Sequence, residues 1–152
     1  MASDFSLPAE DVVVHEAGET PPLPTAEDVI ATGERFLGLR YLWAGVSAYG
    51  VDCSGYTYTL FHHHGISIDR DAGDQMHHSG LEPVEREDLQ RGDLVFFATA
   101  PGGDSIRHVA LYLGDDLIMQ APNAERSVEV MSLTAYDPTG EYAGARRVAL
   151  AD

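Results

Sequence analysis

The chain has 152 residues, 44% of them hydrophobic, and it carries 25 acidic against 9 basic residues, a net charge of −16 at pH 7. This composition is typical of one soluble globular domain, and the missing Lys/Arg stripe argues against nucleic acid or an anionic membrane as a partner. The single cysteine excludes an internal disulfide and a cysteine-rich zinc site.

Residues 1–24 have the pattern of a tail or an interdomain linker, because the segment GETPPLPT is rich in proline and favours extended backbone. The N-terminus lacks the basic and apolar regions of a signal peptide, and no apolar run approaches the ~20 residues that span a bilayer. We therefore expect a cytoplasmic protein, or a secreted or cell-wall protein if the natural chain begins before Met1.

The first half of the chain predicts helices. Thr25, followed by acidic residues, is a candidate N-cap, and apolar residues then recur at helical spacing. The expected helices cover residues 25–38, 53–65 and 69–80, and an aromatic, glycine-bearing loop covers 39–50.

The second half predicts β-strands, separated by Gly, Pro, Asp and Asn. The five candidates cover residues 93–99, 106–114, 117–121, 127–133 and 143–150. Helices first and strands second imply an α+β domain over residues 25–152, with the N-terminal helices packed on an antiparallel β-sheet.

The lone cysteine stands at the expected start of the second helix. Asp52 is a plausible N-cap, which puts Cys53 in the first helical turn. Unpaired N–H groups and the helix dipole favour an anion there, so we expect the pKa of the thiol to fall. With a histidine nearby, Cys53 is a candidate nucleophile. The alternative is a buried structural cysteine without chemistry, as most lone cysteines are.

A histidine in the segment IRHVALYLG is the candidate general base. Its aliphatic residues alternate with His108, so they face the core and His108 faces the other way, toward a cleft. If residues 114–116 form a three-residue hairpin loop, Ala110 pairs with Gln120, and Gln120 becomes the diagonal neighbour of His108. The Gln120 carbonyl would then fix the tautomer of the ring. A two-residue turn would break this arrangement.

Together these segments resemble the NlpC-type cell-wall peptidases, a bacterial superfamily of cysteine peptidases with a reduced papain-like fold. The matching pieces occur in the family's order over residues 25–148 and are FLGLRYLWAG, DCSGYTYTLFHHHGI, RGDLVFF, HVALYLGDDLIMQAP and EYAGARR. The resemblance implies a triad of Cys53 as nucleophile, His108 as general base and acid, and Gln120 as the orienting residue. The family commonly has histidine at the third position, in a segment reading HAP, where this chain has QAP.

The same resemblance implies a substrate. Family members hydrolyse peptidoglycan stem peptides at the bond between γ-D-glutamate and diaminopimelate or lysine. Tyr41 and the backbone N–H of Cys53 would bind the oxyanion. Asp52 and Ser54 would line the pocket for the L-Ala-γ-D-Glu portion, and an ionised Asp52 would pair with a free L-Ala amine.

The resemblance also implies that SH3-like domains precede the catalytic domain, as in the most similar subgroup of the family. Arg70 and Asp71 have at most a rim role, and we expect neither a metal nor an organic cofactor. Residues 62–64, three histidines, are expected to end a helix and not to bind a metal. Two alternatives stay open: a non-catalytic module that binds cell wall or muropeptides on the same fold, and an amide or acyl transferase that uses the same cysteine.

Overall fold

The computed structural model describes residues 9, 14 and 16–152, so much of the predicted tail over residues 1–24 lies outside the described residues. Residues 16–24 contain a turn and neither helix nor strand. Helix α1 (Ala26–Glu34) then begins at the predicted N-cap. The Thr25 hydroxyl accepts from the Asp28 N–H, and the Asp28 carboxylate accepts from the Thr25 N–H, which makes a capping box.

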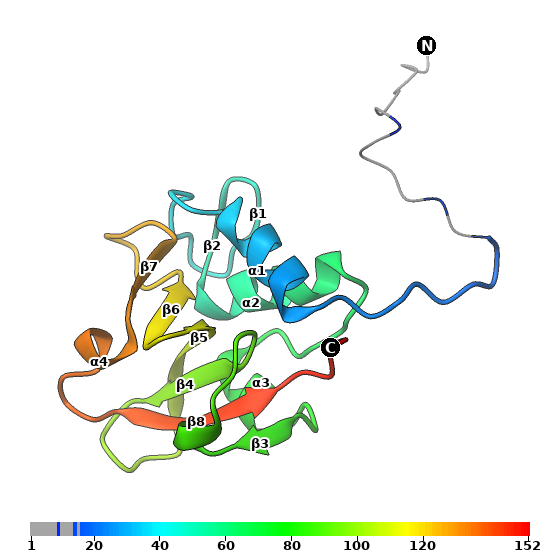
Figure 1. Cartoon of the computed structure of the whole chain (residues 1–152). Coiled ribbons are helices and arrows are strands. Elements are labelled where there is room, and N and C mark those ends of the chain that lie inside the picture. Colours follow the sequence, from blue (N-terminus) through cyan, green and yellow to red (C-terminus); the bar gives the residue numbers. More distant parts are fainter. Residues whose placement is uncertain (1–8, 10–13, 15) are drawn as a thin grey trace.

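Six antiparallel strands form the main sheet, in the order β3-β8-β4-β5-β6-β7 (Figure 1). Their bounds are β3 (Glu82–Val84), β4 (Leu94–Ala98), β5 (Ile106–Gly114), β6 (Leu117–Gln120), β7 (Glu129–Ser132) and β8 (Tyr142–Arg147). All five residues of β4 are buried, as expected for a central strand covered on both faces. The last strand, β8, lies between β3 and β4, so it is paired with a neighbouring strand on both sides.

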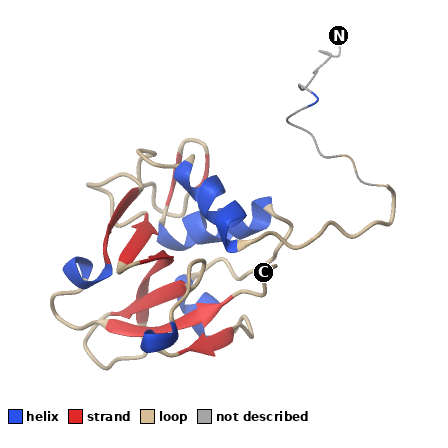
Figure 2. Cartoon of the chain, viewed as in Figure 1, coloured by secondary structure: helices blue, strands red, loops and turns tan. Residues whose placement is uncertain are grey.

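Helices pack on one face of this sheet (Figure 2). They are α1, α2 (Cys53–His63) and α3 (Ala72–His77). Side chains of β4 alternate: Leu94 and Phe96 join the core under these helices, whereas Val95 and Phe97 join a smaller core on the opposite face. The predicted α+β class, with helices on an antiparallel sheet, is confirmed.

The β5–β6 hairpin turns differently from the prediction. Asp115 and Asp116 have φ values of 50° and 60°, and they form a two-residue turn instead of a three-residue loop. The pairing is irregular between Tyr112 and Gly114, where one extra residue sits in β5 as a bulge. The bulge adds the residue that the shorter turn removes.

Because of this compensation the predicted register survives. Leu111 pairs with Met119, and the same register one residue further places Ala110 opposite Gln120. The expectation that a two-residue turn would separate His108 from Gln120 is therefore wrong, since the bulge restores the parity of the two strands.

Three features were not predicted. The loop over residues 39–50 contains most of a small hairpin, β1 (Val46–Ser47) and β2 (Gly50–Val51). Strand β3 carries a proline and forms the edge of the main sheet, where a missing N–H is tolerated. A short helix, α4 (Leu133–Tyr136), follows β7 and packs its Leu133 on the sheet face away from α1.

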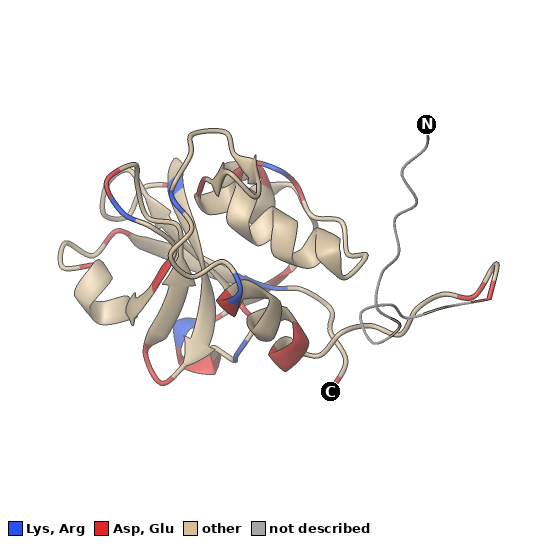
Figure 3. Ribbon diagram, turned by 90° about the horizontal axis from the view of Figure 1, so that it is seen from above, with Lys and Arg blue, Asp and Glu red and all other residues tan. Residues whose placement is uncertain are grey.

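Acidic residues outnumber basic residues, 25 to 9, and they are spread over much of the described structure (Figure 3). All nine basic residues are arginines, and Figure 3 shows the acidic residues distributed over loops and helix ends. Within the described part of the chain, no helix combines the length and the apolar character that a membrane crossing requires.

Candidate active site

Cys53 is the first residue of α2, and Asp52 is the N-cap of that helix, as predicted. The Asp52 carboxylate accepts a hydrogen bond of 2.6 Å from the Gly55 N–H. Only glycine fits at position 55, because a Cβ there would collide with the carbonyl oxygen of Gly45. This close approach presses the loop over residues 39–50 against the head of the helix and leaves the Cys53 side chain half-buried.

The electrostatic setting of the thiol differs from the prediction. Burial raises the pKa of Cys53, and the neighbouring Asp52 carboxylate raises it further. Backbone N–H groups of Val109, Ser54 and Cys53 act in the opposite direction. The expected fall of the thiol pKa is therefore wrong: the helix N-terminus supplies donors, but removal of water from the sulfur outweighs them.

His108 lies on β5 and is only 2% exposed, so the prediction that it faces an open cleft is also wrong. Its ring packs against two aromatic rings that also contact each other, with centroids 5.6 Å from Phe97 and 5.0 Å from Tyr136. Burial lowers the pKa of His108 to about 4, although the hydrogen bond that the ring donates to Gln120 opposes this shift. The imidazole is therefore neutral at pH 7 and has one nitrogen free to accept a proton.

The predicted contact between His108 and Gln120 is present. The His108 Nε2 lies 2.8 Å from the Gln120 Oε1, and both side chains are buried. A carbonyl oxygen only accepts, so the Nε2 carries the hydrogen of this bond and the Nδ1 is the basic nitrogen. On the far side of the amide, the Gln120 Nε2 donates to the Glu129 carboxylate across 3.3 Å.

Two observations bring the thiol and the imidazole into the same region. The backbone N–H that acts on the Cys53 sulfur belongs to Val109, the residue after His108. Burial raises the pKa of Tyr136, which touches the His108 ring, and nearby Cys53 raises it further. Among the described residues no hydrogen bond joins the sulfur to the ring; catalytic hydrogen bonds are often long before a substrate binds.

Arg70 has a larger part than the rim position predicted for it. Its guanidinium donates to the Asp52 carboxylate and to the Ser54 hydroxyl, each across 2.9 Å. Asp52 and Ser54 are both nearly buried, and they flank Cys53 in the chain. The spacing of 16 and 18 residues between these partners gives no local signal, so sequence reasoning had no means of pairing them.

A cavity of about 370 Å³ opens beside the thiol. Its lining residues are Tyr41, Trp43, Ala44, Asp52, Cys53, Ser54, Arg70, Asp71, Ala72, Gly73, Ile106 and Arg107. The predicted pocket residues therefore share one cavity, whereas the buried His108 and Gln120 lie outside its lining. Burial raises the pKa of Tyr41, and the nearby charges of Cys53 and Asp52 raise it further. The Tyr41 hydroxyl therefore keeps its proton and remains a hydrogen-bond donor.

A family model, described as the NlpC/P60 family, matches residues 38–147. The chain belongs to the NlpC/P60 family. The matched region contains the thiol, the imidazole and the whole cavity beside them.

Two similar proteins are much longer than this NlpC/P60 chain. A gamma-D-glutamyl-L-lysine dipeptidyl-peptidase of Bacillus cereus is 52% identical over 126 residues, which are 83% of this chain and 37% of that protein. One of the same name from Bacillus subtilis is 45% identical over 123 residues, 81% of this chain and 41% of that protein. The chain thus spans about two fifths of the length of these relatives.

Solved structures support the fold. The crystal structure of an NlpC/P60 family protein from Bacillus cereus has a TM-score of 0.79 and 51% identity, over 83% of this chain and 41% of that one. The NlpC/p60 domain of the peptidoglycan hydrolase SagA has a TM-score of 0.69 and 27% identity, over 82% of this chain and 99% of that one. The NlpC/P60 chain therefore has the fold that its motifs predicted.

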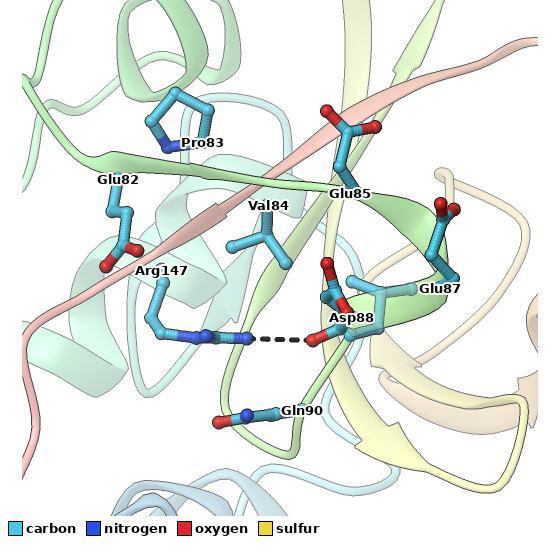
Figure 4. A pocket seen from close by; sticks show the side chains of 9 residues that line it. Glu82, Pro83, Val84, Glu85, Glu87, Asp88, Gln90 and Arg147 are labelled. Carbon is cyan, nitrogen blue, oxygen red and sulfur yellow. Dashed lines mark hydrogen bonds between the residues drawn. The ribbon is translucent and has the colours of Figure 1, made fainter.

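Other clusters of polar side chains lie apart from this site. A hollow of about 520 Å³ at β3 and the following 3-10 helix, η2 (Arg86–Asp88), is lined by four acidic residues and Arg147 (Figure 4). The Arg147 guanidinium donates a hydrogen bond to the Asp88 carbonyl there, and the lining contains neither cysteine nor histidine. The histidines at residues 62–64 end α2, as predicted, and no metal-binding cluster of three ligands exists among the described residues.

Proposed function

We propose that the chain is a cysteine peptidase that cleaves peptidoglycan stem peptides between γ-D-glutamate and diaminopimelate or lysine. The observation that carries the proposal is a half-buried thiol at a helix N-terminus, beside an open cavity and close to a neutral imidazole with a free Nδ1. The names of the Bacillus relatives support this substrate class.

The chemistry follows from the protonation states. Because burial raises the pKa of Cys53 and lowers that of His108, the pair rests as thiol and neutral imidazole. The Nδ1 of His108 takes the thiol proton as the sulfur attacks the carbonyl carbon of the γ-glutamyl amide. The backbone N–H of Cys53 and the hydroxyl of Tyr41 donate to the oxyanion.

The second half of the reaction restores the enzyme. The imidazolium of His108 gives its proton to the departing amine as the C–N bond breaks, which leaves a thioester on Cys53. Water then attacks the thioester while His108 takes one of its protons. The carbon–sulfur bond breaks, the product leaves with a new carboxyl group, and the proton returns to the sulfur.

The cavity suits a short acidic peptide. Asp52 and Ser54 would contact the L-Ala-γ-D-Glu portion, with Asp52 near the free amine of L-Ala. Arg70 and Arg107 are two basic residues of the cavity lining, where Arg70 is paired with Asp52 and Arg107 with Glu141. Such groups match the carboxylates of a stem peptide. An SH3-like domain that precedes this chain, and a catalytic domain over residues 25–152, remain predictions.

The second candidate is a binding module without turnover. It is favoured by Gln120 in the third triad position and by a thiol whose pKa is raised, because both weaken the nucleophile relative to a thiolate–imidazolium pair. An acyl or amide transferase with the same cysteine is a third reading of the same geometry.

One experiment separates the three. L-Ala-γ-D-Glu-L-Lys and its diaminopimelate counterpart are incubated with the chain in water enriched in oxygen-18, with Cys53→Ala as the matched control. A peptidase releases the diamino acid and puts one heavy oxygen into the new carboxyl group. A transferase yields a new amide without the label, and a binding module leaves the peptide intact. Either of the last two results would overturn the proposal.

A further inference from the structure

We propose that Glu129 is a positioning residue that selects the reactive tautomer of His108 by holding the amide of Gln120 in one orientation. This inference deepens the proposed function and rests on it. Glu129 is on β7 and its carboxylate is about a quarter exposed, so it acts through Gln120 and has no place in the cavity lining.

The sheet register makes the contact. Gln120 and Glu129 are directly opposite one another in the β6–β7 pair. Side chains at opposite positions of antiparallel strands share a face and lie close together. His108 reaches the same amide from β5, the strand on the other side of β6. Three adjacent strands, β5, β6 and β7, thus place an imidazole, an amide and a carboxylate side by side across the sheet.

The carboxylate removes the ambiguity of the amide. A glutamine side chain has two donors on one end and an acceptor on the other, so it fits between two groups in either of two orientations. An ionised Glu129 only accepts, and the amide therefore turns its NH₂ toward Glu129, across 3.3 Å, and its carbonyl toward His108, across 2.8 Å. The opposite orientation would set two acceptors against each other at a fully buried side chain.

The amide in turn fixes the ring. Since the Gln120 carbonyl only accepts, the His108 Nε2 must carry a hydrogen. The neutral ring then has its lone pair on Nδ1, the nitrogen that must take the proton of Cys53 in the proposed reaction. A reversed amide would place a donor against Nε2, put the hydrogen on Nδ1 and leave no base for the thiol.

Arg126 keeps the carboxylate in place. Its guanidinium contacts both oxygens of Glu129, at 2.5 and 2.6 Å. Held by this partner, the carboxylate keeps an oxygen turned toward the Gln120 amide. The series of contacts that sets the tautomer therefore runs from Arg126 through Glu129 and Gln120 to His108.

The test reverses the polarity at residue 129. Glu129→Lys puts a donor opposite the amide, Glu129→Leu removes the partner, and Glu129→Asp keeps a carboxylate, which only accepts, and is the conservative control. Side-chain ¹⁵N spectra of the full chain report the tautomer of His108, with His108→Gln identifying its signals. Stem-peptide hydrolysis gives kcat and KM for the same samples.

We expect the wild type and Glu129→Asp to hold the hydrogen on Nε2 and to have similar kcat. In Glu129→Lys the hydrogen moves to Nδ1, and kcat falls by about 100-fold with little change in KM, since a wrong imidazole tautomer costs a catalytic triad up to about 10⁴-fold. Glu129→Leu gives a mixture of tautomers and an intermediate kcat; if Glu129→Lys does not fold, this variant decides.

A Nε2–H tautomer that persists in Glu129→Lys, or in Glu129→Leu if that variant must decide, would overturn the inference. So would a kcat that stays within about 2-fold of wild type, less than the loss of one useful hydrogen bond. If the wild-type chain hydrolyses no stem peptide, the proposed function fails, and the tautomer spectra still decide the role of Glu129 by themselves.

Discussion

The carboxylate of Asp52 and the guanidinium of Arg70 form an ion pair across 2.9 Å, one residue before the thiol of Cys53. The same guanidinium donates to the Ser54 hydroxyl, so one side chain holds both residues assigned to the L-Ala-γ-D-Glu pocket. Because Asp52 also accepts from the Gly55 N–H, a substrate amine would join partners that are already present.

Replacing Arg70 should therefore weaken the pocket, because its guanidinium holds both Asp52 and Ser54. We expect Arg70→Ala to lower kcat/KM for the stem tripeptide about 10-fold, the effect of losing one charge-assisted hydrogen bond in the transition state. Arg70→Lys keeps the charge but lacks the forked guanidinium that reaches Asp52 and Ser54 together, so its kcat/KM should lie between those of the wild type and Arg70→Ala. Steady-state kinetics measure this, and a Lys variant equal to wild type would count against the fork.

The resting state of Cys53 is directly measurable, since the chain has no other cysteine. Burial raises the pKa of this thiol, so the rate of alkylation by iodoacetamide should rise with pH to a midpoint above ~8.5, the ordinary cysteine value. Alkylated protein is counted by intact mass at each pH. A rate that is already maximal at pH 6 would reveal a thiolate–imidazolium pair and contradict the neutral pair.

The pKa of His108 makes a prediction about stability. In the folded chain burial lowers this pKa to about 4, whereas the unfolded value is ~6.5. The unfolded state therefore takes up the proton first as pH falls. The stabilising contribution of the neutral ring is complete above pH ~6.5 and is lost progressively toward pH 4, by about 3 kcal/mol in the free energy of unfolding.

Denaturant unfolding of the wild type and His108→Gln at several pH values isolates that contribution from the many carboxylates. The difference between the two proteins should shrink or change sign as the pH falls from 7 to 4, because only the wild type carries the titrating ring. A difference that is constant over this range would mean that the pKa of His108 is not lowered.

The close approach at Gly55 predicts a sharp steric effect. A methyl group there would collide with the Gly45 carbonyl and with the Asp52 carboxylate. Gly55→Ala should lower the free energy of unfolding by about 1–3 kcal/mol, as overpacking does, and should also reduce hydrolysis because the loop over residues 39–50 carries Tyr41. Gly73→Ala is the matched control for stability alone, because Gly73 also lines the cavity: open space surrounds that helical glycine, and alanine favours a helix. Equal stability of the two variants would refute the steric argument.

Much of the fold was predictable because its signals are local. Thr25 and Asp52 are caps that act within three residues of themselves. Alternation along β5 was enough to put His108 and Gln120 within reach of each other. The register was correct even though the turn was not, because the bulge in β5 compensated for a turn one residue shorter.

The features that escaped prediction depend on distant partners or on burial. Asp93 begins the predicted strand over residues 93–99, yet it is 1% exposed and paired with Arg147, 54 residues away. The raised thiol pKa of Cys53 arises from atoms that pack around the sulfur, which no spacing in the sequence reveals. Glu129 likewise gains its contact only through strand pairing.

The most direct test compares release of the diamino acid from L-Ala-γ-D-Glu-L-Lys by the wild type and by folded Cys53→Ala. Sulfur is the attacking atom in the proposed reaction, so removal of the thiol should lower kcat by about 10³-fold or more, as for other covalent nucleophiles. Hydrolysis by Cys53→Ala within about 10-fold of the wild-type rate would show that Cys53 is not the nucleophile.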